Sequence, residues 1–170
     1  MSLIKKILIV LFINFVASFS YANSEDLKKI GTFKDWETIV VNSDNGKVCF
    51  AQSKPVLQSP KKNDREARLF VTFRPSDKII DEVSTTSGYE YNSQNSIIAA
   101  SGKSKYKFDI AQDNFAWISS NKTEKKIVNR MKKASRIMIT GYNKSGSQTI
   151  DHYSLMGFTK AYNAAKQNCS

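Results

Sequence analysis

The chain has 170 residues, of which 41% are hydrophobic, and its 26 Lys and Arg against 15 Asp and Glu give a formal net charge of +11. This length fits one domain with a buried core and leaves little room for a second domain. One histidine and two cysteines are too few ligands for a metal cluster, so we expect neither a metal nor a cofactor. The excess of positive charge predicts an acidic partner, namely anionic lipid, lipopolysaccharide phosphate or an acidic protein. An AT-rich coding sequence, which also produces Lys, Asn, Ile and Ser, is the alternative explanation of that charge.

Residues 1–22 have the pattern of a secretory signal peptide. Lys5 and Lys6 form a positive start, an apolar run follows, and small residues precede a cleavage site after Ala22. A membrane anchor is the alternative, but the apolar run of about 13 residues is shorter than the roughly 20 residues that a membrane-spanning helix needs. The sequence therefore predicts cleavage after Ala22.

The predicted export places the mature chain, residues 23–170, outside the cytoplasm. We expect a periplasmic protein, with secretion beyond the envelope as the alternative. No second apolar run follows the first, so we expect no transmembrane segment after cleavage. Nucleic acid is a poor partner for an exported protein. Loss of the two lysines Lys5 and Lys6 lowers the formal net charge from +11 to +9.

Cys49 and Cys169 are the two cysteines of the chain. An oxidising compartment favours pairing, and two cysteines allow a single intramolecular disulfide. Two unpaired thiols and an intermolecular bridge are the alternatives. The wide separation of the cysteines differs from the CxxC spacing of a redox motif, so the predicted disulfide is structural.

The segment 23–32 is polar and charged, and we expect it to be a flexible lead-in to one domain over 33–170. Within this domain, short apolar segments alternate with turn residues about every ten positions, which is typical of a β-sandwich or a barrel. Strands are predicted over 47–52, 68–74, 79–86, 96–100, 105–110, 115–119, 136–142 and 147–155. The predicted fold is mainly β, a β-sandwich-like single domain with one basic amphipathic helix and a short C-terminal helix over 158–167.

The basic amphipathic helix begins near Asn121, which we expect to cap it together with Glu124. Ile127, Val128 and Met131 recur at helical spacing and predict a buried stripe with Ala134. The opposite side is basic, and its predicted contacts to an anionic partner are Lys125, Lys126, Arg130, Lys132 and Lys133. An ordinary solvated helix face is the alternative, because charged faces are common on helices.

Four aromatic residues are candidates for ligand contacts. We expect Trp36 and Trp117 to lie in the core, with stacking on a ligand as the alternative. Tyr89 and Tyr91 are flanked by polar residues, and two interpretations stay open for them. They form an exposed aromatic loop for a sugar or a peptide, or they pack within the turn.

Arginine is rare in this chain, so three arginines close in sequence stand out, namely Arg65, Arg68 and Arg74. Arg68 and Arg74 share one face of their predicted strand. We expect them to hold carboxylates of a neighbouring strand, such as Asp81 or Glu82, which is a structural role.

The last third of the chain carries its most specific motif. It reads DHYSLMGFT over 151–159 and resembles the D-x-Y-S-L-x-G-F-S/T signature of the invasion-associated locus B family of exported bacterial proteins. The residues shared with the signature are Asp151, Tyr153, Ser154, Leu155, Gly157 and Phe158. Further features that match the family in order are Phe33, Asp35, Trp36, Cys49, Ser53, Pro55, the segment 68–75, Gly88, Tyr89, Ala116, Trp117, Met131 and Cys169.

The resemblance implies an exported, mostly β domain and does not imply an enzyme. Asp151 and His152 are adjacent on a predicted strand, so their side chains point to opposite faces and cannot form an acid–histidine pair. We expect no catalytic residues here. Instead, Tyr153 and Leu155 are predicted to pack inward, Asp151 to accept turn or backbone hydrogen bonds, and Gly157 to permit a strand-to-helix bend.

Three functions follow from these observations. The first is a non-enzymatic periplasmic interaction protein that binds an envelope component or a protein partner. The second is a hydrolase or isomerase of the cell envelope, which the poverty of acid–base groups disfavours. The third is a secreted host-interaction factor, which depends on the family resemblance alone.

Overall fold

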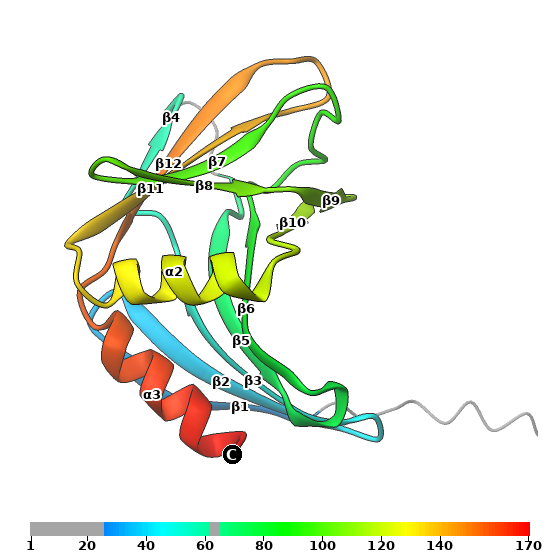
Figure 1. The fold of residues 1–170 in the computed structure, drawn as a ribbon, viewed down its shortest axis with the longest axis vertical. Helices are drawn as coiled ribbons and strands as arrows, with labels where there is room; N and C mark the ends of the chain where they lie inside the picture. Colours follow the sequence, from blue (N-terminus) through cyan, green and yellow to red (C-terminus); the bar gives the residue numbers. More distant parts are fainter. Residues whose placement is uncertain (1–25, 62–64) are drawn as a thin grey trace, which may run out of the picture.

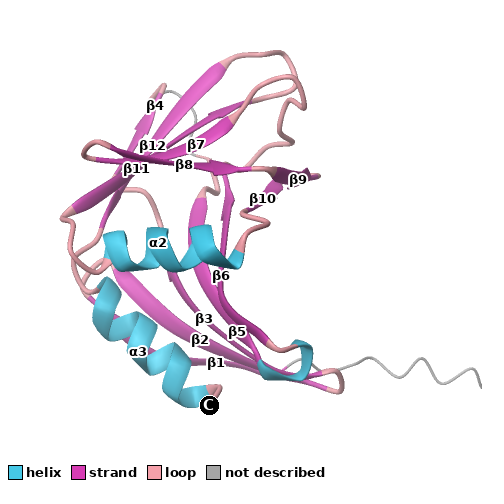
Figure 2. Cartoon of the chain, viewed as in Figure 1, coloured by secondary structure: helices cyan, strands magenta, loops and turns pink. Residues whose placement is uncertain are grey.

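In the computed structural model, which describes residues 26–61 and 65–170, the chain forms two antiparallel sheets and two α-helices (Figure 1, Figure 2). The predicted mainly β, β-sandwich-like fold with a basic helix and a short C-terminal helix is confirmed. Residues of both sheets and both helices share one buried hydrophobic cluster. The predicted signal peptide, 1–22, lies outside the described residues.

The larger sheet, called here the large sheet, has seven strands in the order β1-β2-β3-β5-β6-β10-β9. Its strands are β1 (Asp26–Phe33), β2 (Trp36–Ser43), β3 (Gly46–Ser53), β5 (Arg68–Arg74), β6 (Ile79–Thr86), β9 (Ile110–Gln112) and β10 (Phe115–Trp117). A short 3-10 helix, η1 (Pro75–Asp77), joins β5 to β6. Strands β5 and β6 have the predicted bounds. Apolar residues alternate along β5, whereas β6 is rich in residues that favour strands.

The smaller sheet, called here the small sheet, has five strands in the order β4-β12-β11-β7-β8. Its strands are β4 (Leu57–Ser59), β7 (Ile97–Ser101), β8 (Ser104–Phe108), β11 (Arg136–Tyr142) and β12 (Gln148–Ser154). The single strand predicted over 105–110 is wrong, because the chain crosses there from β8 in the small sheet to β9 in the large sheet.

The predicted flexible lead-in over 23–32 is also wrong for the part of it that the structure describes. Residues from Asp26 onward form β1, which pairs with β2 through Leu27–Val41 and Lys28–Val40. The strand is almost entirely exposed at the edge of the sheet, so its sequence shows no hydrophobic alternation. Backbone pairing with β2, and not side-chain burial, orders this segment.

The two helices, α2 (Asn121–Met131) and α3 (Phe158–Asn168), pack against the large sheet. Helix α3 packs on β1, β2 and β3, and α2 packs on β6 (Figure 1). The residue that caps α2 is Ser120 and not Asn121, because the Ser120 side chain accepts a hydrogen bond from the amide of Thr123. Glu124 is buried and accepts a hydrogen bond from the Val83 amide on β6 at 3.0 Å, so it ties the helix to the sheet.

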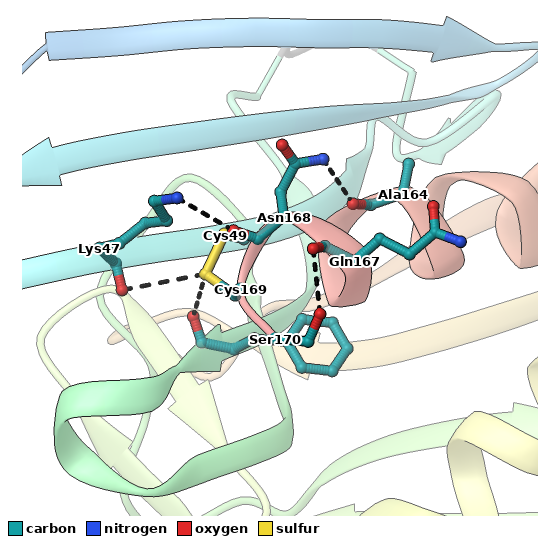
Figure 3. Close-up of a disulfide and its surroundings, with 8 residues drawn as sticks. Lys47, Cys49, Ala164, Gln167, Asn168, Cys169 and Ser170 are labelled. Carbon is teal, nitrogen blue, oxygen red and sulfur yellow. Dashed lines mark hydrogen bonds between the residues drawn. A yellow bond between two sulfur atoms is a disulfide. The ribbon is translucent and has the colours of Figure 1, made fainter.

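The predicted disulfide between Cys49 and Cys169 is present, with a Cα–Cα distance of 5.9 Å (Figure 3). It connects the buried centre of β3 to the end of α3, across a sequence separation of 120 residues. Lys47 also reaches this helix end, because its ammonium donates to the backbone carbonyl of Asn168. The last helix is thus held on the large sheet by a covalent bond and by a polar contact.

Candidate functional site

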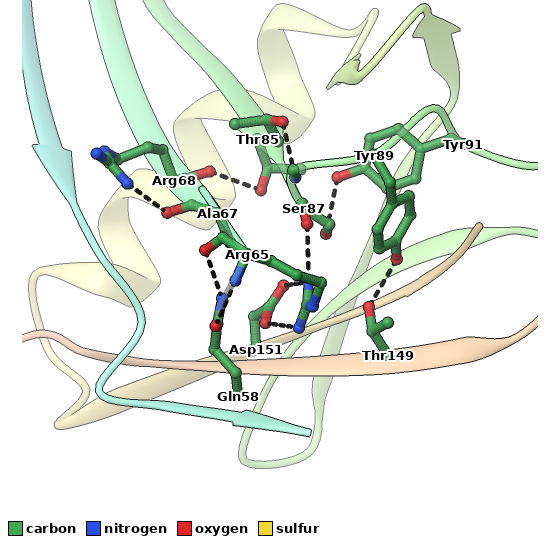
Figure 4. Close-up of polar contacts among 12 residues, drawn as sticks. Gln58, Arg65, Ala67, Arg68, Thr85, Ser87, Tyr89, Tyr91, Thr149 and Asp151 are labelled. Atoms are coloured by element: carbon green, nitrogen blue, oxygen red, sulfur yellow. Dashed lines mark hydrogen bonds and ion pairs between the residues drawn. The ribbon is translucent and has the colours of Figure 1, made fainter. Parts of the chain in front are cut away.

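The signature residue Asp151 is fully buried and pairs with Arg65, which lies just before β5 (Figure 4). The guanidinium donates two hydrogen bonds to the carboxylate, at 3.0 Å and 2.5 Å, and a third to the backbone carbonyl of Ser87. The prediction that Asp151 accepts turn or backbone hydrogen bonds is therefore wrong. Its partner is a side chain 86 residues away in sequence. The pair links β12 of the small sheet to the segment just before β5 of the large sheet.

Tyr89 and Tyr91 pack around this ion pair. The Tyr89 hydroxyl shares a hydrogen bond of 2.6 Å with Thr149, and the Tyr91 hydroxyl donates to Ser87 at 3.0 Å (Figure 4). Burial raises the pKa of both phenols. An exposed aromatic loop is therefore excluded for this pair, and packing within the turn is the interpretation that holds.

The other signature residues have structural positions. Tyr153 and Leu155 are buried, as predicted, and so is Phe158, whose ring contacts that of Trp36 at a centroid distance of 4.8 Å. Gly157 has a φ of +91°, and a Cβ atom at this position would lie 1.7 Å from the carbonyl oxygen of Phe33. Glycine is needed at this strand-to-helix bend because no side chain fits between the two backbones.

The signature also contacts the beginning of the domain. The Trp36 indole donates a hydrogen bond of 2.9 Å to the carbonyl of Ser154, and the Asp35 amide donates to the carbonyl of Met156. The first and last segments that match the family in sequence thus pack against each other. These contacts hold the start of β2 against the segment between β12 and α3.

The arrangement gives no support for a catalytic triad in this stretch. His152 lies on the opposite face of β12 from Asp151, as predicted, and the carboxylate is occupied by Arg65. The Ser154 hydroxyl accepts a hydrogen bond from the Met156 amide. Within residues 26–61 and 65–170, no group of three or more His, Cys, Asp or Glu side chains could hold a metal ion. Over the same residues, no helix is long and apolar enough to cross a membrane.

On the basic side of α2, some side chains are exposed and others contact neighbouring parts of the molecule. Ile127, Val128 and Met131 are buried, as predicted. Three of the predicted contact residues are exposed, namely Lys125, Lys126 and Lys133. Arg130 and Lys132 are only half-exposed, and each already has an intramolecular partner.

Arg130 donates a hydrogen bond to the Ser101 hydroxyl at 3.3 Å. The Lys132 ammonium lies 3.7 Å from the centroid of the Tyr162 ring, and burial lowers the pKa of this lysine. A cation over an aromatic face is stabilised by the ring quadrupole, so this contact holds α2 against α3. The structure therefore assigns these two of the five predicted contacts a packing role.

Strand β8 runs antiparallel to α2 and extends its basic side. At the turn between β7 and β8, Arg130 of α2 contacts Ser101, the last residue of β7. Directly after β8, Asp109 accepts two hydrogen bonds from Ser119, which lies just before α2. Figure 1 shows β8 alongside α2. The exposed lysines of the two elements define what we call the basic surface, which consists of Lys103, Lys105, Lys107, Lys122, Lys125, Lys126 and Lys133. The lysines at 103, 105 and 107 were not among the predicted contacts, although their alternation was a usable signal.

The predictions for the remaining core and ion-pair residues are confirmed in part. Trp36 is buried, as predicted, whereas Trp117 is only half-buried and lines a surface pocket, so its assignment to the core is wrong. Arg74 pairs with Glu82 of the neighbouring strand at 2.8 Å, as predicted. Arg68 pairs instead with Glu66, at 2.9 Å.

Comparison with known families agrees with this structure. The sequence model described as Invasion associated locus B (IalB) protein matches residues 36–166. The match spans most of the chain and includes β2, which begins at Trp36, and most of α3, so the chain belongs to this family. Searches of curated proteins and of solved structures gave no match.

Proposed function

We propose that this member of the invasion-associated locus B family is an exported, non-enzymatic protein of the periplasm. It binds an anionic component of the envelope, either lipid phosphate or lipopolysaccharide phosphate, through the basic surface of α2 and β8. One observation carries the proposal. The seven lysines of that surface are exposed, and among the described residues none of them pairs with a carboxylate.

The physical basis is the field of these unpaired ammonium groups. Each lysine close to an anionic membrane surface contributes about 1 kcal/mol to binding, and the attraction weakens within a Debye length. A cluster of seven therefore suffices for measurable binding at low ionic strength. Phosphate is the favoured anion because ammonium groups bind it as point charges and need no fixed geometry.

The structure supports this proposal more than it supports an envelope hydrolase or isomerase. The Asp151 carboxylate is occupied by Arg65, the Ser154 hydroxyl accepts from the Met156 amide, and His152 lies on the opposite face of β12 from Asp151. A secreted host-interaction factor remains the second candidate. The observation that favours it is membership of a family described as invasion associated. Both functions require a binding surface and no catalytic group.

The test is co-sedimentation of the purified mature protein with lipid vesicles at low salt. Vesicles of phosphatidylglycerol and phosphatidylcholine provide the anionic surface, and vesicles of phosphatidylcholine alone are the control. We expect binding to the anionic vesicles only, and weaker binding of the variant K125Q/K126Q/K133Q. Equal binding of the variant and the wild type would overturn the proposal.

A further inference from the structure

Four aromatic rings form a continuous row across one face of the large sheet. Phe50 on β3 contacts Phe70 on β5 at a centroid distance of 5.9 Å, Phe70 contacts Phe115 on β10 at 6.1 Å, and Phe115 stacks on Trp117 at 5.8 Å. Strand register places these rings on one face, because Phe70 pairs with Ser84 and Ser84 pairs with Trp117. We call these four residues the aromatic row.

The aromatic row lies on the face of the sheet that points away from the core. Leu69, Val71 and Phe73 alternate with Phe70 along β5 and are buried, and the Phe73 ring contacts Tyr162 of α3. Helix α2 packs on β6 from the same inner side, through the bond between Glu124 and Val83. None of the four rings belongs to the buried core cluster, and each is half-buried. Within residues 26–61 and 65–170, no helix or second sheet packs on this outer face.

Two pockets lie near the aromatic row, and Trp117 lines the first of them. The first pocket has a volume of about 470 Å³, and its lining includes Ile80, Ile110 and Gln112. Ile80 and Ile110 are large apolar side chains that are 61% and 47% exposed. The second pocket has a volume of about 340 Å³, and its lining includes Glu37, Gln52 and Arg68. Gln52 pairs in register with both Glu37 and Phe70, so these side chains share the outer face with the row.

The two arginines on this face are paired within the molecule, and the lysines that line its pockets, Lys34, Lys54 and Lys78, lie outside the aromatic row. Lys29 pairs with Glu37 at 2.5 Å, Arg68 with Glu66 at 2.9 Å, and Arg74 with both Glu82 and Asp77 at 2.8 Å and 3.2 Å. This balance contrasts with the basic surface, whose lysines have no such partners. A ligand that complements the outer face is therefore apolar on one side, rich in hydrogen-bonding groups and without net charge.

We propose that the outer face of the large sheet binds a neutral oligosaccharide along the aromatic row. Aromatic faces carry negative charge and attract the polarised C–H groups on the flat side of a sugar ring. The side chains of Gln52, Glu37, Gln112 and Arg68 supply the planar donors and acceptors that hydroxyl groups need. From β3 to β10 the row crosses three strand spacings, which is roughly 14 Å. The site is therefore suited to a chain of several sugar units.

Two other occupants fit less well. A second copy of the chain carries the same large positive charge, and this charge opposes association of two copies. A proline-rich peptide docks on aromatic grooves, but such grooves bind the peptide carbonyls through side-chain donors. Three of the four rings here are phenylalanine, so Trp117 alone could donate from the row. An oligosaccharide needs the ring faces more than the ring donors.

An array of immobilised neutral oligosaccharides of four or more units tests the proposal, with the mature protein applied at 0.5 M NaCl. High salt suppresses binding through the basic surface, so failure of this proposal and failure of the proposed function are distinguishable. We expect binding to at least one neutral glycan, quenching or a shift of Trp117 fluorescence on titration with that glycan, and no binding of a proline-rich peptide.

Substitutions in the row supply the decisive comparison. Phe70→Thr and Trp117→Thr should each weaken glycan binding by roughly tenfold or more, because each removes one stacking surface. Phe70→Tyr keeps the ring and should retain binding, which keeps the test valid if a threonine variant fails to fold. The variant K125Q/K126Q/K133Q should bind the glycan like the wild type. The proposal is overturned if the protein binds no neutral glycan, or if Phe70→Thr leaves glycan binding unchanged. It is also overturned if the protein binds the peptide instead, or if it forms a dimer that Phe70→Thr abolishes.

Discussion

The Arg65 guanidinium is bound in a bidentate manner by the Asp151 carboxylate, and both side chains are removed from solvent, with 9% and 0% of their surfaces exposed. This pair connects the segment before β5 to the middle of β12 and so fixes the two sheets relative to each other. The most specific sequence motif of the chain thus begins with a residue that stabilises the fold.

Asp151→Asn should lower the free energy of unfolding by about 3–5 kcal/mol, because it leaves the Arg65 charge buried without its partner. Urea denaturation followed by circular dichroism measures this change. The matched control is Glu90→Gln, which breaks the exposed pair with Lys144 and should cost less than about 1 kcal/mol. Similar losses for the two variants would show that burial of the pair does not matter.

Removal of the disulfide should destabilise the protein without changing its fold. The double variant C49S/C169S is expected to lose about 2–5 kcal/mol, because the bond closes a loop of 120 residues. Dithiothreitol should destabilise the wild type to a similar extent and leave the double variant unaffected. Detection of two free thiols in the purified oxidised protein would show that the bond does not form.

Gly157→Ala should be far more destabilising than Gly146→Ala. Both glycines have positive φ values, +91° and +81°, so both substitutions strain the backbone. At Gly157 the added Cβ also collides with the Phe33 carbonyl, whereas at Gly146 the nearest atom is 4.0 Å away. Thermal unfolding of the two variants compares them directly, and equal melting temperatures would contradict the close approach of Gly157 and Phe33.

Glu124 should make stability depend on pH. Burial raises the pKa of this carboxyl to about 6, with nearby Glu82 and Asp81 adding to the effect. In the unfolded chain the pKa is near its ordinary value of about 4.3, so the folded state binds more protons between the two values. The contribution of Glu124 therefore favours folding below about pH 4.3 and decreases as the pH rises through about 6.

Glu124→Gln removes this titration and keeps an acceptor for the Val83 amide. The difference in unfolding free energy between wild type and variant should shift against the wild type from pH 4 to pH 7, as measured by urea denaturation at several pH values. A difference that stays constant over this range would show that Glu124 titrates normally.

The regular parts of the fold could be predicted because the alternation of apolar residues in a strand and their spacing in a helix involve only residues close in sequence. Strand β5 is found in this way, and so is the buried stripe of α2. Strand β1 has no such pattern, because an exposed edge strand buries neither face. The partnership of Arg65 with Asp151 could not be predicted, since it depends on how two distant segments come together.

The candidate surfaces were predictable to different degrees. The lysines of α2 are evident from helical spacing, but the intramolecular contacts of Arg130 and Lys132 depend on neighbours outside the helix. The aromatic row is assembled from four residues on three strands, with two of them on β10. In sequence, Phe70 stands beside the inward-facing Leu69 and Val71, so it reads as part of an ordinary core strand.

The central claim is that α2 and β8 form one anion-binding surface, and matched charge variants test it most directly. Three variants each remove three exposed lysines: K125Q/K126Q/K133Q on α2, K103Q/K105Q/K107Q on β8, and K54Q/K160Q/K166Q elsewhere. Their net charges are equal, so non-specific attraction is the same in all three. The measurement is the affinity of each variant for vesicles that contain phosphatidylglycerol, at a fixed low salt concentration.

We predict that the α2 and β8 variants lose affinity to a similar extent, whereas the third variant binds nearly as well as the wild type. If all three variants lose affinity equally, only the net charge matters and the basic surface is not a binding site.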